Sequence, residues 1–136
     1  MVVGGWAVAA HGHGRATDDL DVLVRPTAEN ARRVFGALEA FGAPVRNHEV
    51  TAELFERAEY GYRMGRKPLL IEVLTTIDGV SFDDAAADPV HVPIAELRVP
   101  FIGLDALLAN KRAAGRPKDL ADVAVLEGTG RADGGD

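Results

Sequence analysis

Apolar and polar positions follow two different periods along the chain, and the change of period separates predicted strands from predicted helices. Short apolar runs rich in β-branched residues predict strands. The run Leu69–Leu74 is the clearest of them, because a single glutamate interrupts five apolar residues. The predicted strands are Val2–Val3, Leu20–Val24, Leu69–Leu74 and Leu97–Ile102.

Apolar residues spaced three and four positions apart predict the helices. The segment Ala28–Phe41 has this spacing, follows the N-cap residue Thr27 and ends before Gly42, so both of its ends carry recognised signals. The predicted helices are Trp6–His11, Ala28–Phe41, Thr51–Ala58, Leu104–Ala114 and Pro117–Glu127.

The alternation of strands and helices predicts one domain of the α+β (α/β-like) class over residues 1–127. A chain of 136 residues suits a single hydrophobic core. We expect the stretch Thr75–Pro93 to be irregular, and the glycine-rich tail 128–136 to be disordered.

Charge and composition exclude several classes of protein. The 21 acidic residues outnumber the 15 basic ones, and the net charge of −6 argues against a general nucleic-acid binder. The absence of cysteine excludes disulfides and thiolate metal sites. The apolar start, Met1–Ala10, lacks a preceding basic region and is too short to span a bilayer. We therefore expect a cytoplasmic protein with no membrane association.

Two aspartates at the start of the second predicted strand, one directly before it and one within it, are the first candidates for chemistry. Residues i and i+2 of a strand point to the same side, so Asp19 and Asp21 lie together. Neighbouring carboxylates repel each other unless a cation or solvent compensates them, and carboxylate oxygens suit Mg²⁺ or Mn²⁺. Paired ions of this kind support nucleotidyl transfer. An acidic turn before a strand would give the same pattern.

A third acid, Glu72, lies within the apolar run Leu69–Leu74. A strand that is apolar on both faces is expected to be buried and central, where an unpaired carboxylate is costly. Either a metal shared with Asp19 and Asp21 or a salt bridge to an arginine would compensate Glu72. We predict the metal site, with these three acids as its ligands.

A pair of glycines, Gly4 and Gly5, lies where the first strand is predicted to give way to a helix. Glycines at such a position let phosphate oxygens approach backbone N–H groups. Tight turns use the same pair of residues, so the pair alone is weak evidence for a nucleotide site.

Taken together, these residues resemble a known signature. The segment Val3–Gly12, followed by Arg15, Thr17, Asp19 and Asp21, is similar to the signature of the nucleotidyltransferase superfamily. The similarity is greatest to the minimal branch that includes AbiEii-type toxins, and lincosamide and aminoglycoside nucleotidyltransferases open in a similar way. Members of the family usually have a helix and a longer strand before the glycine pair.

A second block, Asp105–Val123, resembles the Lys–Arg–Lys-Asp–Asp block of AbiEii-like proteins. The resemblance implies that Lys111 reaches the phosphates of a nucleotide. The local pattern is compatible with this role, because Lys111 shares a helical stripe with Leu104, Leu107 and Leu108. A lysine on a buried stripe either extends its ammonium to the surface or meets an anion.

The resemblance also implies a mixed sheet flanked by helices, a nucleotide over Gly4 and Gly5, metal ions on Asp19 and Asp21, and Glu72 as the third acid. These residues would bind an NTP together with Mg²⁺ or Mn²⁺.

Several residues keep two interpretations. Arg15 would either touch phosphate or neutralise the nearby acids. Asp119 lies near a helix start, where an acid is stabilising in any case, and Asp122 could form a salt bridge with Arg116. Trp6 is expected in the core rather than as a platform for stacking bases.

The function predicted from these observations is metal-dependent transfer of an NMP group from an NTP to an acceptor hydroxyl. Catalysis would rest on Asp19, Asp21 and Glu72. The acceptor is left open between a small molecule, a tRNA end and a protein side chain. An alternative is a non-catalytic nucleotide-binding or toxin–antitoxin regulatory module of the same fold, acting as a homodimer or with a toxin–antitoxin partner. A third is an unrelated α/β domain with a chance Asp-x-Asp.

Overall fold

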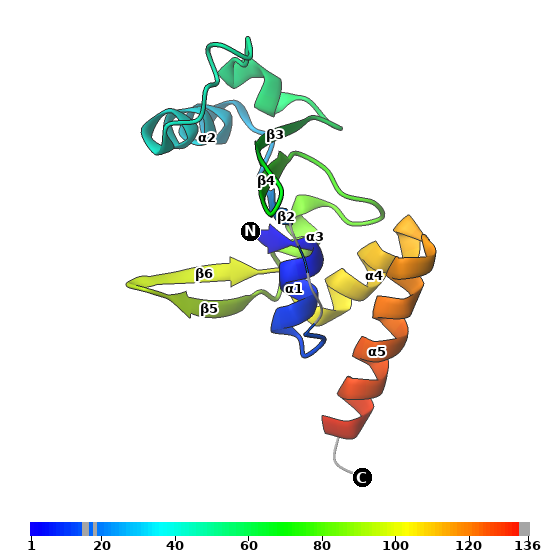
Figure 1. Cartoon of the computed structure of the whole chain (residues 1–136). Helices are drawn as coiled ribbons and strands as arrows, with labels where there is room; N and C mark the ends of the chain where they lie inside the picture. The colour runs from blue at the N-terminus through cyan, green and yellow to red at the C-terminus, as the bar shows by residue number, and fades with distance from the viewer. Residues whose placement is uncertain (15–16, 18, 134–136) are drawn as a thin grey trace.

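The computed structural model describes residues 1–14, 17 and 19–133. Its centre is a six-stranded mixed sheet with the strand order β3-β4-β2-β1-β6-β5, shown in Figure 1. Two pairs of neighbouring strands, β2 with β4 and β1 with β6, are parallel, and the other pairs are antiparallel. The strands are β1 (Val2–Val3), β2 (Asp19–Leu23), β3 (Gly61–Arg66), β4 (Leu69–Leu74), β5 (Val90–Ile94) and β6 (Leu97–Phe101).

Helices flank this sheet, and the chain has the mixed α+β architecture that the sequence predicts. The cap signals explain the ends of α2, where Thr27 Oγ1 accepts the N–H of Asn30 at 3.3 Å and Gly42 adopts a left-handed conformation with φ 96°. The helices are α1 (Gly4–Ala10), α2 (Ala28–Phe41), the 3₁₀ helix η1 (Ala52–Glu56), α3 (Phe82–Ala85), α4 (Leu104–Ala114) and α5 (Pro117–Asp133).

Several elements differ from the prediction. The stretch Thr75–Pro93, expected to be irregular, contains the helix α3 and most of the strand β5. Strands β3 and β5 were not expected, and both are edge strands of the sheet. Edge strands tolerate polar residues and proline, here Pro93 in β5, so their sequence pattern is weak. The helix α5 continues to Asp133, beyond the expected end at Glu127 and into the stretch predicted as disordered. Residues 134–136 lie outside the described part of the chain.

Two hydrophobic clusters hold the elements together. The larger one joins β1 to α1, α4 and α5, and includes Val8, Leu107 and Leu126. The smaller one joins α2 and η1 to β3 and β4, and includes Phe55 and Val73. Because the first cluster attaches α1 and α4 to the middle of the sheet, it positions these helices beside the acids of β2.

The prediction that Trp6 belongs to the core is wrong. The side chains of α1 that face the core are Ala7 and Val8, each 0% exposed, whereas Trp6 is 47% exposed. Trp6 instead lines an apolar cavity of about 560 Å³ together with residues of the sheet such as Val22 and Ile71. In the described part of the chain, no helix combines the length and the apolar character needed to cross a membrane.

Candidate functional site

The register of two parallel strands brings the three predicted acids to one face of the sheet. Strand β2 pairs with β4 so that Asp21 lies opposite Glu72, and Asp19 lies opposite Leu70. Paired residues of neighbouring strands point to the same side, and so do residues two apart. Asp19, Asp21 and Glu72 therefore share a face, although they come from strands about fifty residues apart in the chain.

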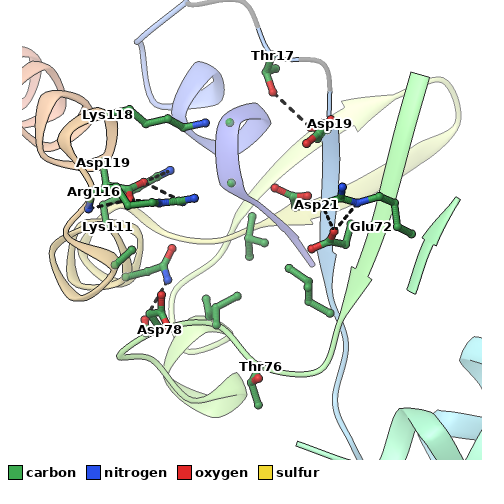
Figure 2. Close-up of a pocket in the computed structure, with 18 residues that line it drawn as sticks. Thr17, Asp19, Asp21, Glu72, Thr76, Asp78, Lys111, Arg116, Lys118 and Asp119 are labelled. Atoms are coloured by element: carbon green, nitrogen blue, oxygen red, sulfur yellow. Dashed lines mark hydrogen bonds and ion pairs between the residues drawn. The ribbon is translucent and has the colours of Figure 1, made fainter. Parts of the chain in front are cut away.

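These acids line a cavity of about 330 Å³. Figure 2 shows Asp19, Asp21 and Glu72 on one side, which we call the strand side, and Lys111, Arg116, Lys118 and Asp119 on the other, which we call the helix side. The glycines at the start of α1 line the cavity between the two sides. The cavity therefore has an acidic side formed by β2 and β4, and a mainly basic side formed by α4 and α5.

The glycine pair is required by the protein's own side chains. Gly4 has a left-handed φ of 66°, and a Cβ added there would overlap the carboxylate of Asp21. A Cβ added at Gly5 would lie 2.5 Å from Thr17 Oγ1, closer than van der Waals contact permits. The sequence analysis explained these glycines by the approach of a phosphate. In the structure, the groups that approach Gly4 and Gly5 closely are the side chains of Asp21 and Thr17.

Glu72 has the arginine partner that was the alternative to a metal. Arg63 is its direct neighbour in the antiparallel β3–β4 pair. Its Nε donates to Glu72 Oε2 at 2.9 Å, and its Nη2 forms an ion pair with the same oxygen at 2.8 Å. This hydrogen bond, and then the charge of Glu72, raise the pKa of Arg63. Strand β4 lies inside the sheet, second from its edge, but the expectation that it is buried is wrong. Val73 is its only buried residue, Leu69 is 79% exposed, and the side chain of Glu72 is 24% exposed.

The two aspartates are less well compensated than Glu72. Asp19 Oδ1 is buried and has no hydrogen-bond partner among the described residues, a situation that is rare and costly in folded proteins. Burial raises the pKa of Asp21, and the negative charges of Glu72 and Asp19 raise it further. A cation placed between these oxygens would relieve both effects.

The donor set suits Mg²⁺ or Mn²⁺, since both prefer carboxylate oxygens, and the buried partnerless oxygen of Asp19 is a free ligand atom. However, no three His, Asp or Glu side chains of the described residues are already arranged to hold a metal ion. Glu72 is turned to Arg63. The residue types therefore fit a divalent cation, and binding one would require Glu72 to change its partner.

On the helix side, Lys111 meets anions of the protein itself. Its ammonium lies 3.2 Å from Asp119 Oδ1 and 3.5 Å from Asp122 Oδ2. Lys111, Asp119 and Asp122 are 5%, 0% and 2% exposed. The predicted buried position of Lys111 is correct, but its removal would leave two buried carboxylates without this cation. Asp122 also lies 3.6 Å from His13 Nε2.

Arg116 completes the network from the surface. Its Nε donates to Asp119 Oδ2 at 2.7 Å, and Asp119 also accepts the backbone N–H of Arg116 at 3.3 Å. The second contact is the returning half of a capping box at the start of α5. Burial alone would raise the pKa of Asp119, but the hydrogen bonds from Arg116 and Lys111 outweigh it and lower the pKa.

Most of the lining residues were not named as site residues from the sequence, and three of them have a clear place in the site. Thr17 packs against Gly5, Arg63 holds Glu72, and Lys118 lines the cavity as an exposed cation without an ion pair to any described residue. Only the cross-strand register could have revealed Arg63. Lys118 stands beside Asp119 in the second motif block, which is the signal that could have revealed it. Arg15, a predicted phosphate ligand, lies outside the described residues.

No protein-family model matches this chain, and a search of curated proteins finds no match. The relation to nucleotidyltransferases therefore stays a prediction that rests on the motif residues.

Proposed function

We propose that this protein is a divalent-metal-dependent nucleotidyltransferase that transfers an NMP group from an NTP to an acceptor hydroxyl. The observation that carries the proposal is the cavity, which places three carboxylates opposite Arg116 and Lys118. An NTP bound with Mg²⁺ needs both kinds of group, since the metal binds carboxylates and the phosphates bind cations.

In the proposed reaction, the acceptor oxygen attacks the α-phosphorus of the NTP. The bond between this phosphorus and the bridging oxygen breaks, and pyrophosphate leaves. Asp19, Asp21 and Glu72 would hold Mg²⁺ or Mn²⁺, which supplies positive charge to the attacking and leaving oxygens when bound. Glu72 would complete this ligand set or accept the proton of the acceptor hydroxyl.

On the helix side, Lys118 is the cation most available for the phosphates, because it is exposed and has no ion pair with the described residues. The guanidinium of Arg116 is oriented by Asp119 and lines the same cavity. Lys111 would act mainly through this network, because Asp119 and Asp122 already compensate its charge. We infer a cytoplasmic location, with a small molecule, a tRNA end or a protein side chain as the acceptor.

A thermal-shift measurement tests the site. A ligand that binds only the folded state raises the melting temperature according to its concentration and affinity. We expect Mg²⁺ or Mn²⁺ with a non-hydrolysable NTP to raise it, and the rise to disappear in Asp19→Asn and Asp21→Asn. The absence of any shift in a folded wild-type sample at millimolar ligand would contradict the proposal. Pyrophosphate release with candidate acceptors then tests the reaction itself.

The alternative is a non-catalytic nucleotide-binding module, possessing the same site and acting with a second copy or a toxin–antitoxin partner. The observation that favours it is that Glu72 and Lys111 are both held by partners within the protein. Metal-dependent nucleotide binding without pyrophosphate release in the presence of any acceptor would support this module over the enzyme.

A further inference from the structure

The pairing of Arg63 with Glu72 bears on how a metal would enter the cavity. Arg63 comes from the edge strand β3 and faces Glu72 across the β3–β4 pair. Both of its contacts go to the same carboxylate oxygen, Oε2. Figure 2 marks these contacts as dashed lines that end at Glu72, and Arg63 is itself one of the residues that line the cavity. The guanidinium thus lies next to the carboxylate that the proposed metal would share.

We propose that Arg63 is an internal cation that competes with the divalent metal for Glu72, so that Arg63 sets the metal affinity of the site. The inference rests on the proposed function, because it takes the strand side as the metal site. A metal bound to Glu72 Oε2 would place two cations against one oxygen, and their repulsion would favour the departure of the guanidinium.

The exposure of the two side chains makes such an exchange feasible. The side chain of Arg63 is 63% exposed and that of Glu72 is 24% exposed. Arg63 can therefore move into solvent without leaving a hole in the core, whereas Glu72 stays at the cavity. The pair is partly exposed, so its contribution to stability is small and the exchange needs little energy.

The distribution of charge on the strand side supports the same conclusion. Three carboxylates line this side, and among the described residues Arg63 forms an ion pair with one of them, Glu72. Asp19 Oδ1 is left buried and without a partner among the described residues. Arg63 compensates Glu72 but not this oxygen. A divalent ion carries twice the charge and could be shared by Asp19, Asp21 and Glu72, which a guanidinium held on Glu72 does not achieve.

The test measures binding of Mn²⁺ alone by isothermal titration calorimetry to the wild-type protein and four variants. Arg63→Gln removes the competing charge, and Arg63→Lys keeps a cation but loses the two-pronged contact. Arg66→Gln is the matched control, because Arg66 lies on the same strand, outside the cavity, and its loss changes the net charge equally. Asp21→Asn shows whether the Mn²⁺ measured is bound at the strand side.

We expect Arg63→Gln to bind Mn²⁺ about five-fold more tightly than Arg66→Gln, the factor by which a partly exposed ion pair changes an equilibrium. Arg63→Lys should lie between Arg63→Gln and the wild type. Equal affinity of Arg63→Gln and Arg66→Gln would overturn the inference, and so would weaker binding by Arg63→Gln. If either result is obtained and Asp21→Asn nevertheless abolishes Mn²⁺ binding, the inference about Arg63 fails but the proposed metal site stands. If Asp21→Asn binds Mn²⁺ as tightly as the wild type does, or if the wild type binds no Mn²⁺, both the metal site and the inference fail.

Discussion

On the helix side of the cavity, Lys111, Arg116 and Asp119 satisfy one another, whereas on the strand side Asp19 and Asp21 are left with little compensation. The strand side is acidic and half-buried, the helix side is mainly basic with a buried centre, and the two sides differ also in whether each charge has a partner. A satisfied buried network is expected to stabilise the fold, and its disruption is costly. Uncompensated carboxylates lower stability and gain when a cation binds.

This difference separates residues that stabilise the fold from residues that are available to a ligand, although the sequence motifs contain both kinds. Lys111 and Asp119 belong to the second motif block, from which a phosphate-binding role was predicted for Lys111, yet the contacts they make are those of a structural ion-pair network. The strand side keeps a ligand atom free in Asp19 Oδ1. We therefore expect substitutions on the helix side to act first on stability, and substitutions on the strand side to act first on ligand binding.

The largest expected effect is that of Lys111→Met. Removing one member of a buried ion pair leaves the other charge uncompensated, at a cost of about 3–5 kcal/mol, and here two buried carboxylates lose this cation. Urea unfolding would measure the change. Lys118→Met is the matched control, because Lys118 is exposed on the same side and should change the free energy of unfolding by less than about 0.5 kcal/mol. A loss below about 1 kcal/mol for Lys111→Met would show that the network is not structural.

The next effect is that of Gly4→Ala. Its left-handed φ of 66° and the overlap of a Cβ with the Asp21 carboxylate should together lower the free energy of unfolding by about 1–3 kcal/mol. In the double variant Gly4→Ala/Asp21→Ala, the loss of unfolding free energy caused by the steric overlap should be recovered, whereas the loss caused by the left-handed φ should remain. Gly36→Ala is the control, because Gly36 lies within α2 with open space around it, and alanine there should stabilise the helix by about 0.5–1 kcal/mol. A Gly4→Ala protein as stable as the wild type would contradict the close packing.

The smallest effect is an opposite response to pH on the two sides. The pKa of Asp21 is raised from its ordinary 3.8, so ionised Asp21 costs stability as the pH rises from this value through the folded pKa. Asp21→Asn should therefore be neutral or slightly stabilising at neutral pH, by less than about 1 kcal/mol, and this gain should vanish below pH 3.8. The measurement is urea unfolding of the variant and the wild type across this range, without metal.

Asp119 should behave in the reverse sense. Its pKa is lowered, so it contributes stability that is present above its ordinary value of 3.8 and is lost as the pH falls through the folded pKa. Asp119→Asn should be destabilising at neutral pH, and the penalty should shrink in acid. If Asp21→Asn and Asp119→Asn showed the same pH dependence of stability, the strand side and the helix side would not differ in how their charges are compensated.

Local signals in the sequence were sufficient for much of the fold. Both ends of α2 follow from Thr27 and Gly42, and the C-terminal end of α4 follows from Gly115, since such signals act within one turn of the helix. The edge strands β3 and β5 could not be recognised in the same way, because an edge strand is formed by hydrogen bonds to a neighbour and needs no continuous apolar face.

The candidate site likewise has features that follow from local sequence and features that depend on contacts between distant segments. The sequence by itself determined that Asp19 and Asp21 point to one side, because alternation is a property of any strand. Only the tertiary structure decided that Glu72 pairs with Arg63 and that Lys111 pairs with Asp119. Strand register and the docking of α5 against α4 bring these charges together, and neither is encoded in local spacing. Which charge receives a partner depends on these distant contacts, and the partner determines whether a residue stabilises the fold or remains available to a ligand.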